Sequence, residues 1–177
     1  MSPFTPEQAR FILMSTALPT LGAEHPVTRS VIAAIPPEQA GYRPNDIGRS
    51  AIDLAWHIAA SEVRFLTAVA AGVFDFGGSA RPESIQTPGD VIGWYAERFA
   101  AAIETLKQAS GEQLAKIVDF RGILQFPAVL YLQIGQSHTV HHRGQLSMYL
   151  RPMGAKVPSI YGESFDAREA REKAASS

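Results

Sequence analysis

The sequence predicts an all-α protein whose core is a four-helix bundle. Four long segments carry the apolar periodicity, the capping residues and the stop signals of helices. The last of them is apolar nearly all round, which is typical of a helix inside a bundle. The chain has 177 residues and shows no repeat, low-complexity tract or second domain. This length suits one domain with a full hydrophobic core.

The first predicted helix begins at a capping motif in residues 5–8, Thr-Pro-Glu-Gln. The threonine is the N-cap, the proline fits the first helical position, and the glutamine completes a capping box. The helix continues towards Leu18. Pro19 and Pro26 are expected to break or kink it, because proline removes a backbone hydrogen bond and its ring clashes with the preceding turn. A second piece, residues 27–35, is expected to continue the same rod at an angle.

Two further helices are predicted in the middle of the chain. Ser50 is a plausible N-cap for a helix over residues 51–71, and Gly72 follows as its C-cap. Residues 74–86 are rich in glycine and have no apolar period, so they are predicted to form a loop. A Thr-Pro pair then begins the next helix, which covers residues 91–108.

The last third of the chain is predicted to hold a linker, the fourth helix and a tail. Residues 114–124 mix short apolar runs with a glycine and are expected to include a short hairpin. Residues 126–151 form the fourth helix, which is expected to be the most buried because it is apolar nearly all round. We expect residues 1–162 to form the single domain. Residues 163–177 are charged and alanine-rich, and they are expected to form a polar tail that frays.

Composition and charge exclude several classes of partner. The net charge is −1, so nothing indicates a basic surface for nucleic acid. There is no cysteine, which excludes disulfides, thiolate nucleophiles and sulfur ligands for a metal. No apolar run approaches the ~20 residues that span a membrane, and the apolar cluster near the N-terminus is too short for a signal peptide. We expect a cytoplasmic protein with no nucleic-acid or membrane partner.

Histidines indicate a metal site. Three of the five histidines lie within residues 138–142, and His138 and His142 are four residues apart. On a helix this spacing stacks both imidazoles on one face, where they can bind one divalent metal. His57 lies in the middle of the second long helix, and it would face the pair if that helix packed beside the last one. Three neutral imidazoles suit zinc, nickel, iron or copper and leave one position open to water.

An ordinary structural role is the alternative for each histidine. For His57 taken alone, the role of a satisfied core residue is favoured over that of a ligand. His141 is three residues from His138 and can replace His142 as a ligand, but it lies farther round the helix, so a neighbouring role is favoured. His25 precedes a proline and is expected at the surface.

Other polar side chains accompany the histidines. Glu62 falls inside the apolar arc of its helix, where it acts either as a base beside the metal or as the partner of an arginine from another helix. Tyr131, Gln145 and Tyr149 share the histidine face of the last helix. They either orient ligands and contact substrate or are ordinary amphipathic residues. Arg143 points away from this face and is expected to form a structural salt bridge.

These motifs resemble a known family. His-Thr-Val-His-His-Arg-Gly-Gln at residues 138–145, followed by Tyr-Leu-Arg, a glycine and Val-Pro within residues 149–158, closely resembles the C-terminal signature of the DinB/YfiT-like family. Leu-Ala-Trp-His-Ile-Ala-Ala-Ser-Glu at residues 54–62 is similar to that family's other histidine-bearing helix. The resemblance covers most of the chain, roughly residues 5–162.

The resemblance implies an up-up-down-down four-helix bundle that binds a divalent metal, often nickel or zinc. The metal ligands carried over to this sequence are His57, His138 and His142. Homodimers are frequent in the family. Some relatives transfer low-molecular-weight thiols such as mycothiol or bacillithiol to electrophiles, and others are suspected hydrolases. The family name refers to damage-inducible expression, which implies a role in stress.

The function predicted from these features is that of a metalloenzyme that activates a thiol or water for attack on a small electrophile. Because the chain has no cysteine, the thiol must be a cosubstrate. Glu62 or Tyr131 would move protons. The alternatives are a non-catalytic stress protein that binds a metal or a small molecule, and a structural bundle whose histidines bind nothing.

Overall fold

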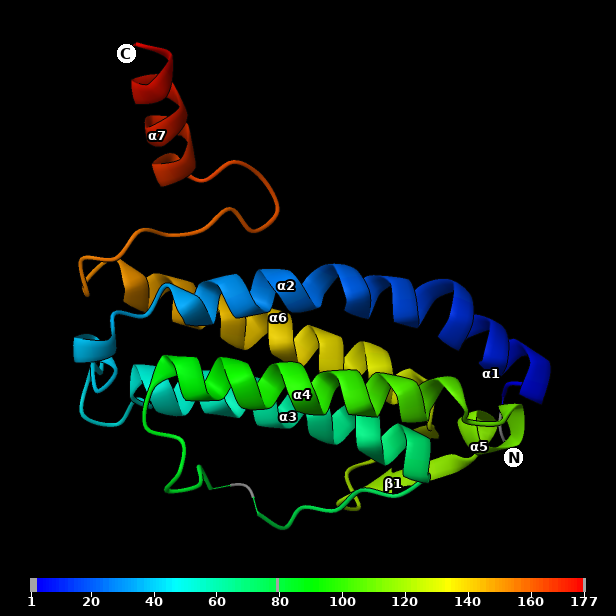
Figure 1. Ribbon diagram of the computed structural model, residues 1–177. Helices are drawn as coiled ribbons and strands as arrows, with labels where there is room; N and C mark the ends of the chain where they lie inside the picture. Colours follow the sequence, from blue (N-terminus) through cyan, green and yellow to red (C-terminus); the bar gives the residue numbers. More distant parts are fainter. Residues whose placement is uncertain (1–2, 79, 177) are drawn as a thin grey trace.

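The computed structural model describes residues 3–78 and 80–176, and helices dominate it (Figure 1). The predicted all-α bundle is confirmed, with one small two-stranded sheet added. In chain order the elements are α1 (Pro6–Ile12), the π-helical turn η1 (Leu13–Ala17), α2 (Leu18–Ala33), the 3₁₀ turn η2 (Pro37–Gln39), α3 (Ala51–Ala71), α4 (Pro88–Lys107), α5 (Gly111–Ala115), β1 (Ile117–Phe120), β2 (Leu124–Pro127), α6 (Leu130–Leu150) and α7 (Phe165–Ala175).

Four rods make the bundle: the continuous rod α1–η1–α2, and the helices α3, α4 and α6. Figure 1 shows the first rod and α6 running one way, and α3 and α4 running the other way. Contacts of α3 with α4 and α6, and of α2 with the same two helices, close the rods into a ring. Around this ring two neighbouring rods point up and two point down, but the up-up-down-down order along the chain that the resemblance implied is not what the structure shows. Along the chain the directions read up, down, down, up, so the loop before α4 must carry the chain back along the length of α3.

The first rod is not broken at its prolines, so the expected separate piece over residues 27–35 is wrong. The capping box is confirmed, with Thr5 and Gln8 bonded to each other's backbone N–H. Pro19 falls in the first turn of α2, just after the wider π-helical turn η1, and proline is tolerated in a first turn. Pro26 lies inside α2 without ending it. Figure 1 shows a curved but continuous rod, which ends at Ala33.

The capping residues of α3 and α4 also behave as predicted. Ser50 accepts a hydrogen bond from the backbone N–H of Asp53, and Gly72 ends α3 with a left-handed φ of 69°. Thr87 and Asp90 form a capping box at the start of α4. Between these helices, the described parts of the 74–86 segment contain no helix or strand, which confirms the predicted loop.

The predicted hairpin is present but extends farther than expected. Strands β1 and β2 pair antiparallel, with Ile117 opposite Pro127 and Phe120 opposite Leu124. The chain reverses at Arg121 and Gly122, which both have positive φ. Since residues 126 and 127 are used in β2, α6 begins at Leu130 and not at residue 126 as predicted.

The most buried helix is α3, so the expectation that the last helix is the most buried is wrong. Thirteen of the 21 residues of α3 are buried, against seven of the 21 in α6. The physical reason is position: α3 packs extensively against both α4 and α6, whereas α6 packs extensively against α3 and less against α2. Apolar residues of α6 such as Met148, which is 72% exposed, point outward instead.

The C-terminal tail, expected to fray, is helical. Ser164 caps α7, none of whose described residues is buried, and Figure 1 shows this helix standing away from the bundle. The tail is tied back by Asp166, which forms a salt bridge with Arg151 and accepts a hydrogen bond from the backbone of Val157. The predicted domain boundary at residue 162 stays a prediction. No helix in the described ranges is both long enough and apolar enough to cross a membrane.

Close packing of α3 against α6 depends on Gly135. A Cβ at this position would lie 2.7 Å from Cγ and 2.8 Å from Cβ of Phe65 on α3. We expect Gly135→Ala to lower the free energy of unfolding by about 2 kcal/mol or more, because α6 must move away from α3. Urea unfolding measures this. Gly144→Ala on the same helix is the control: its Cβ meets open space, so it should raise stability by about 0.5–1 kcal/mol. Equal stabilities of the Gly135→Ala protein and the wild type would contradict the close approach.

Candidate metal centre

The three histidines predicted as metal ligands lie together, on two neighbouring helices. His57 comes from α3, and His138 and His142 come from consecutive turns of α6. Nε2 of His57 is 3.1 Å from Nε2 of His138 and 3.2 Å from Nε2 of His142. Among the described residues, these three form a histidine cluster with metal-site geometry.

The ring spacing fits one divalent ion. Metal–nitrogen bonds of about 2.0–2.1 Å hold two ligand nitrogens roughly 3.3 Å apart at a tetrahedral angle, and roughly 2.9 Å apart at an octahedral one. The observed separations of 3.1 and 3.2 Å lie between these values. All three rings present the same atom, Nε2, so one ion at their meeting point would have three protein ligands and open positions left over.

Two side chains contact the Nδ1 atoms of the histidines, on the side of each ring away from the cluster. Nδ1 of His142 lies 2.6 Å from Oε1 of Gln145, which can only accept a hydrogen bond, so the proton of His142 is on Nδ1 and Nε2 is free to bind a metal. Ser61 Oγ lies 3.5 Å from Nδ1 of His57, and because a hydroxyl both donates and accepts, it can pair with either tautomer of that ring. Gln145 was considered for this orienting role from the sequence. Ser61 was missed, although its position four residues after His57 places it on the same helix face.

Electrostatics keep the rings neutral. Burial first, and then the neighbouring histidines and Arg49, together lower the pKa of His57 and of His138 to about 4. Burial also lowers the pKa of His142, although its hydrogen bond to Gln145 opposes the shift. A neutral imidazole has the lone pair that a metal requires. The cluster is therefore in its metal-binding protonation state at neutral pH.

An aromatic wall closes one side of the cluster. The ring of Phe65 on α3 lies 6.1 Å from that of His138, between centroids. Phe65 in turn stacks on Phe120 of β1 at 6.0 Å and meets Phe74 of the 74–86 loop edge-on at 5.5 Å. Helix, hairpin and loop thus each contribute one ring to this wall, which meets the histidines at Phe65.

Glu62, predicted to move protons, is fully inside the bundle. It is 2% exposed and accepts a hydrogen bond from the hydroxyl of Tyr95 on α4. Burial raises its pKa to about 8, while Thr139 and Arg143 act in the opposite direction. No arginine of the described residues forms a salt bridge with Glu62, so the alternative of a direct arginine partner is not what the structure shows.

Tyr131, the other residue predicted to move protons, faces the hairpin. Its hydroxyl lies 2.9 Å from the carbonyl oxygen of Val118 and 3.0 Å from that of Leu124, one on each strand. In the part of the chain that the structure describes, neither Tyr131 nor Glu62 has a hydrogen bond to the three histidines. Their predicted roles are not decided by these contacts.

The position expected for His141 is confirmed, and the position expected for His25 is wrong. His141 is exposed beside His142 and stays outside the cluster, as expected. His25 is not a surface residue: its ring stacks on Phe99 at 3.8 Å, and burial lowers its pKa to about 4. The reason is the unbroken course of α2 through Pro26, which turns His25 towards α4.

The raised pKa of Glu62 predicts a pH dependence of stability. Its folded-state pKa of about 8 lies above the ordinary value of 4.5, so between these values the folded chain holds a proton that the unfolded chain has released. This stabilisation is complete below pH 4.5 and is lost as the pH rises through 8. Compared with the wild type, Glu62→Gln should therefore gain more than ~1 kcal/mol of stability between about pH 5 and pH 9.

Urea unfolding of both proteins across this pH range measures the effect. Histidine titration is common to both proteins and cancels in the difference. Glu97→Gln, at an exposed position, controls for the loss of one carboxylate. A stability difference between wild type and Glu62→Gln that does not change with pH would contradict the raised pKa.

The fold and the site together define a class: helical bundles with three histidines gathered from two helices at one metal-type site. The chain belongs to the DinB family, whose model matches residues 16–173. The Bacillus subtilis protein YjoA is 28% identical to it over 136 residues, which are 72% of this chain and 82% of YjoA.

Two crystal structures have the same fold. That of the DinB-like protein YjoA of Bacillus subtilis superposes with a TM-score of 0.67 at 24% identity, over 81% of this chain and 96% of YjoA. That of a DinB-like protein of Bacillus cereus ATCC 10987 superposes with a TM-score of 0.70 at 21% identity, over 84% of this chain and 97% of the other. At these identities the structures establish the architecture and not the reaction.

Proposed function

We propose that the protein is a metalloenzyme that uses a divalent ion, nickel or zinc, to activate a thiol or a water molecule for attack on a small electrophile. The observation that supports this most is the convergence of three neutral imidazole Nε2 atoms at separations suited to one ion. A bound divalent ion would supply Lewis acidity, which lowers the pKa of a thiol or water at its open position.

The chain's own residues would do the rest. His57, His138 and His142 hold the ion, and Gln145 keeps His142 in the tautomer that binds it. The wall that begins at Phe65 limits access of bulk water to one side of the site. A thiol would come from a low-molecular-weight cosubstrate, since the chain has no cysteine. This fits the cytoplasmic location predicted from the sequence, where such thiols are kept reduced.

Proton transfer is assigned to Glu62 before Tyr131. A carboxyl group with a pKa of about 8 can both hold and release a proton near neutral pH. The Tyr131 hydroxyl is already engaged by two main-chain carbonyls, and its pKa is raised by burial, so it releases a proton less readily. Glu62→Gln should change the pH profile of turnover, whereas Tyr131→Phe should mainly loosen the hairpin.

Turnover by the metal-loaded protein tests the proposal. Protein purified without a histidine tag is loaded with nickel or zinc and offered small thiols with a chromogenic aryl halide, and separately nitrophenyl esters. We expect turnover by wild type and by His141→Ala, and at least a ~100-fold loss in His138→Ala. Activity that is equal in His138→Ala and wild type would exclude the three-histidine site as its origin.

Two outcomes would favour the alternatives. Stoichiometric metal without turnover on either substrate class would support a non-catalytic stress protein that binds metal or a small molecule. Less than about a tenth of an equivalent of metal, and no melting-temperature change on adding nickel or zinc, would leave a structural bundle. The homodimer implied by the family resemblance forms part of the proposal, and sedimentation velocity of the full chain tests it.

A further inference from the structure

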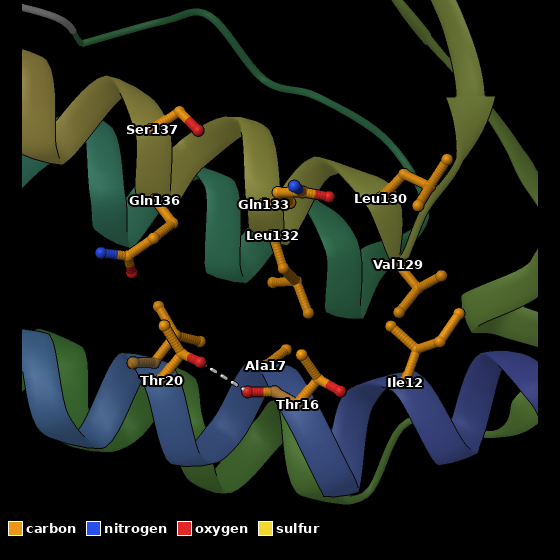
Figure 2. A pocket seen from close by; sticks show the side chains of 11 residues that line it. Ile12, Thr16, Ala17, Thr20, Val129, Leu130, Leu132, Gln133, Gln136 and Ser137 are labelled. Carbon is orange, nitrogen blue, oxygen red and sulfur yellow. Dashed lines mark hydrogen bonds between the residues drawn. The ribbon is translucent and has the colours of Figure 1, made fainter.

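A hollow lies on the flank of α6 away from the histidines, between this helix and the first rod (Figure 2). It is a cavity of about 370 Å³, within the size range of small-molecule sites. Gln136, which points towards it, is two residues before His138. At 3.6 residues per turn this is roughly 200° round the helix, so the hollow and the histidines face different sides of the bundle. The lining residues that matter here are Thr16, Thr20, Leu21, Val129, Leu132 and Gln136.

The lining has an apolar floor and a neutral polar rim. Leu21, Val129 and Leu132 are buried at the floor. The rim carries hydroxyl and amide side chains that are exposed, among them Thr16 and Thr20. None of the lining residues is charged. A charged ligand would lose its hydration here without gaining a counter-ion, so the hollow suits an uncharged molecule with an apolar body.

Gln136 gives the hollow its polar specificity. Figure 2 shows its side chain extending from α6 towards the helix opposite. Both its amide oxygen and its amide nitrogen are buried, and neither has a hydrogen-bond partner among the described residues. A buried amide without a partner is unfavourable, so it is satisfied best by a group that both donates and accepts a hydrogen bond. A carboxamide or lactam edge has this pairing.

The wall opposite Gln136 has an unusual backbone. Residues 13–17 form the π-helical turn η1, which contributes Thr16 and Ala17 to the hollow. Such turns are rare and occur frequently at functional sites. The hydroxyl of Thr20 donates a hydrogen bond to the carbonyl of Thr16 at this turn. The hollow is therefore bordered by a π-helical turn that a side-chain hydrogen bond stabilises.

We propose that this hollow is a second binding site, which takes an uncharged small molecule carrying a carboxamide or lactam edge on an apolar body. The ligand's edge pairs with the Gln136 amide, and its apolar body lies on Leu21, Val129 and Leu132. The site is separate from the histidine centre, so binding does not depend on metal.

Titration of the full-length protein with 2-phenylacetamide, followed by protein NMR, tests the proposal, with phenylacetate as the charged analogue. We expect a dissociation constant on the order of 1 mM for a probe of this size, and binding of phenylacetate at least ~5-fold weaker because its charge is desolvated. The shifted resonances should belong to residues 12–21 and 129–137. Absence of binding at about 10 mM amide, or shifts centred on the histidines, would overturn the proposal.

Two variants and one control sharpen the test. Gln136→Met keeps the length of the side chain and removes the amide, so it should weaken phenylacetamide binding at least ~10-fold without lowering the melting temperature. Ala17→Phe should block the hollow even if Gln136→Met is poorly folded. His138→Ala should bind as wild type does. Unchanged affinity for phenylacetamide in both hollow variants would show that the hollow is not a small-molecule site. The same conclusion would follow if the protein sedimented as a dimer and Ala17→Phe made it a monomer, because a second copy would then cover the hollow.

Discussion

His138→Ala is expected to lower the affinity for nickel or zinc by at least ~100-fold, and to leave the purified chain with less than about a tenth of an equivalent of metal. Substitution of residues that only orient a metal ligand lowers metal affinity about 10–100-fold. Loss of a ligand itself should lower metal affinity by at least the upper value of this range. Here it would leave two imidazoles in place of three, and His57 would lose the partner that lies 3.1 Å away.

A graded series separates ligands from their neighbours. Metal content by mass spectrometry and affinity by competition with a chelator are measured for each purified variant. Gln145→Leu should lower metal affinity about 10-fold, because it removes only the hydrogen-bond acceptor for Nδ1 of His142. His141→Ala removes an exposed imidazole from the same helix and should bind as wild type does. If His138→Ala and His141→Ala retained equal metal, the three-histidine site would be wrong.

Arg143→Met is expected to lower the free energy of unfolding by about 3–5 kcal/mol. The guanidinium is 1% exposed, and its Nη1 lies 2.6 Å from the carboxylate of Glu24 and 3.1 Å from the hydroxyl of Thr28. Its Nη2 donates to the hydroxyl of Tyr161, which brings the C-terminal segment against the bundle. Without the arginine, the Glu24 carboxylate is left largely buried without its counter-ion.

The matched double variant identifies the cause. Glu24→Leu combined with Arg143→Met removes both charges, so it should recover much of the stability that the single change loses. Lys107→Ala, which breaks an exposed salt bridge with Glu104, should change stability by less than ~1 kcal/mol. Chemical unfolding of all four proteins measures these differences. A double variant no more stable than Arg143→Met would show that packing of the long side chain matters more than its charge.

Local signals in the sequence were sufficient to predict the four long rods and to pair His138 with His142. Capping side chains such as Thr5 and Ser50 act within one turn, and the spacing of His138 and His142 places them on one helix face whatever surrounds them. His57 needed one further assumption, that its helix packs beside the last one, and the contact between α3 and α6 confirms it. The salt bridge of Arg143 was also expected, because its position points away from the histidine face.

Features that depend on packing between rods were not predictable in the same way. His25 was assigned to the surface because Pro26 was expected to break the helix, yet α2 continues and carries the ring against Phe99. The burial ranking of α3 and α6 depends on how extensively each helix packs against its neighbours, which composition does not reveal. The hollow beside Gln136 lies between the first rod and α6, so it depends on how these two rods pack, and no sequence motif predicts it.

A metal bound by the three histidines would stabilise the protein against unfolding, because its ligands lie far apart in the chain. His57 and His138 are 81 residues apart, so an ion that joins them fastens the second long helix to the last across nearly half the sequence. Such a fastening acts as a reversible cross-link, and long closed loops restrict the unfolded chain most. At a free ion concentration about 1,000 times the dissociation constant, the folded state would gain roughly 4 kcal/mol. The melting temperature would then report the supply of metal around the protein as well as the packing within it.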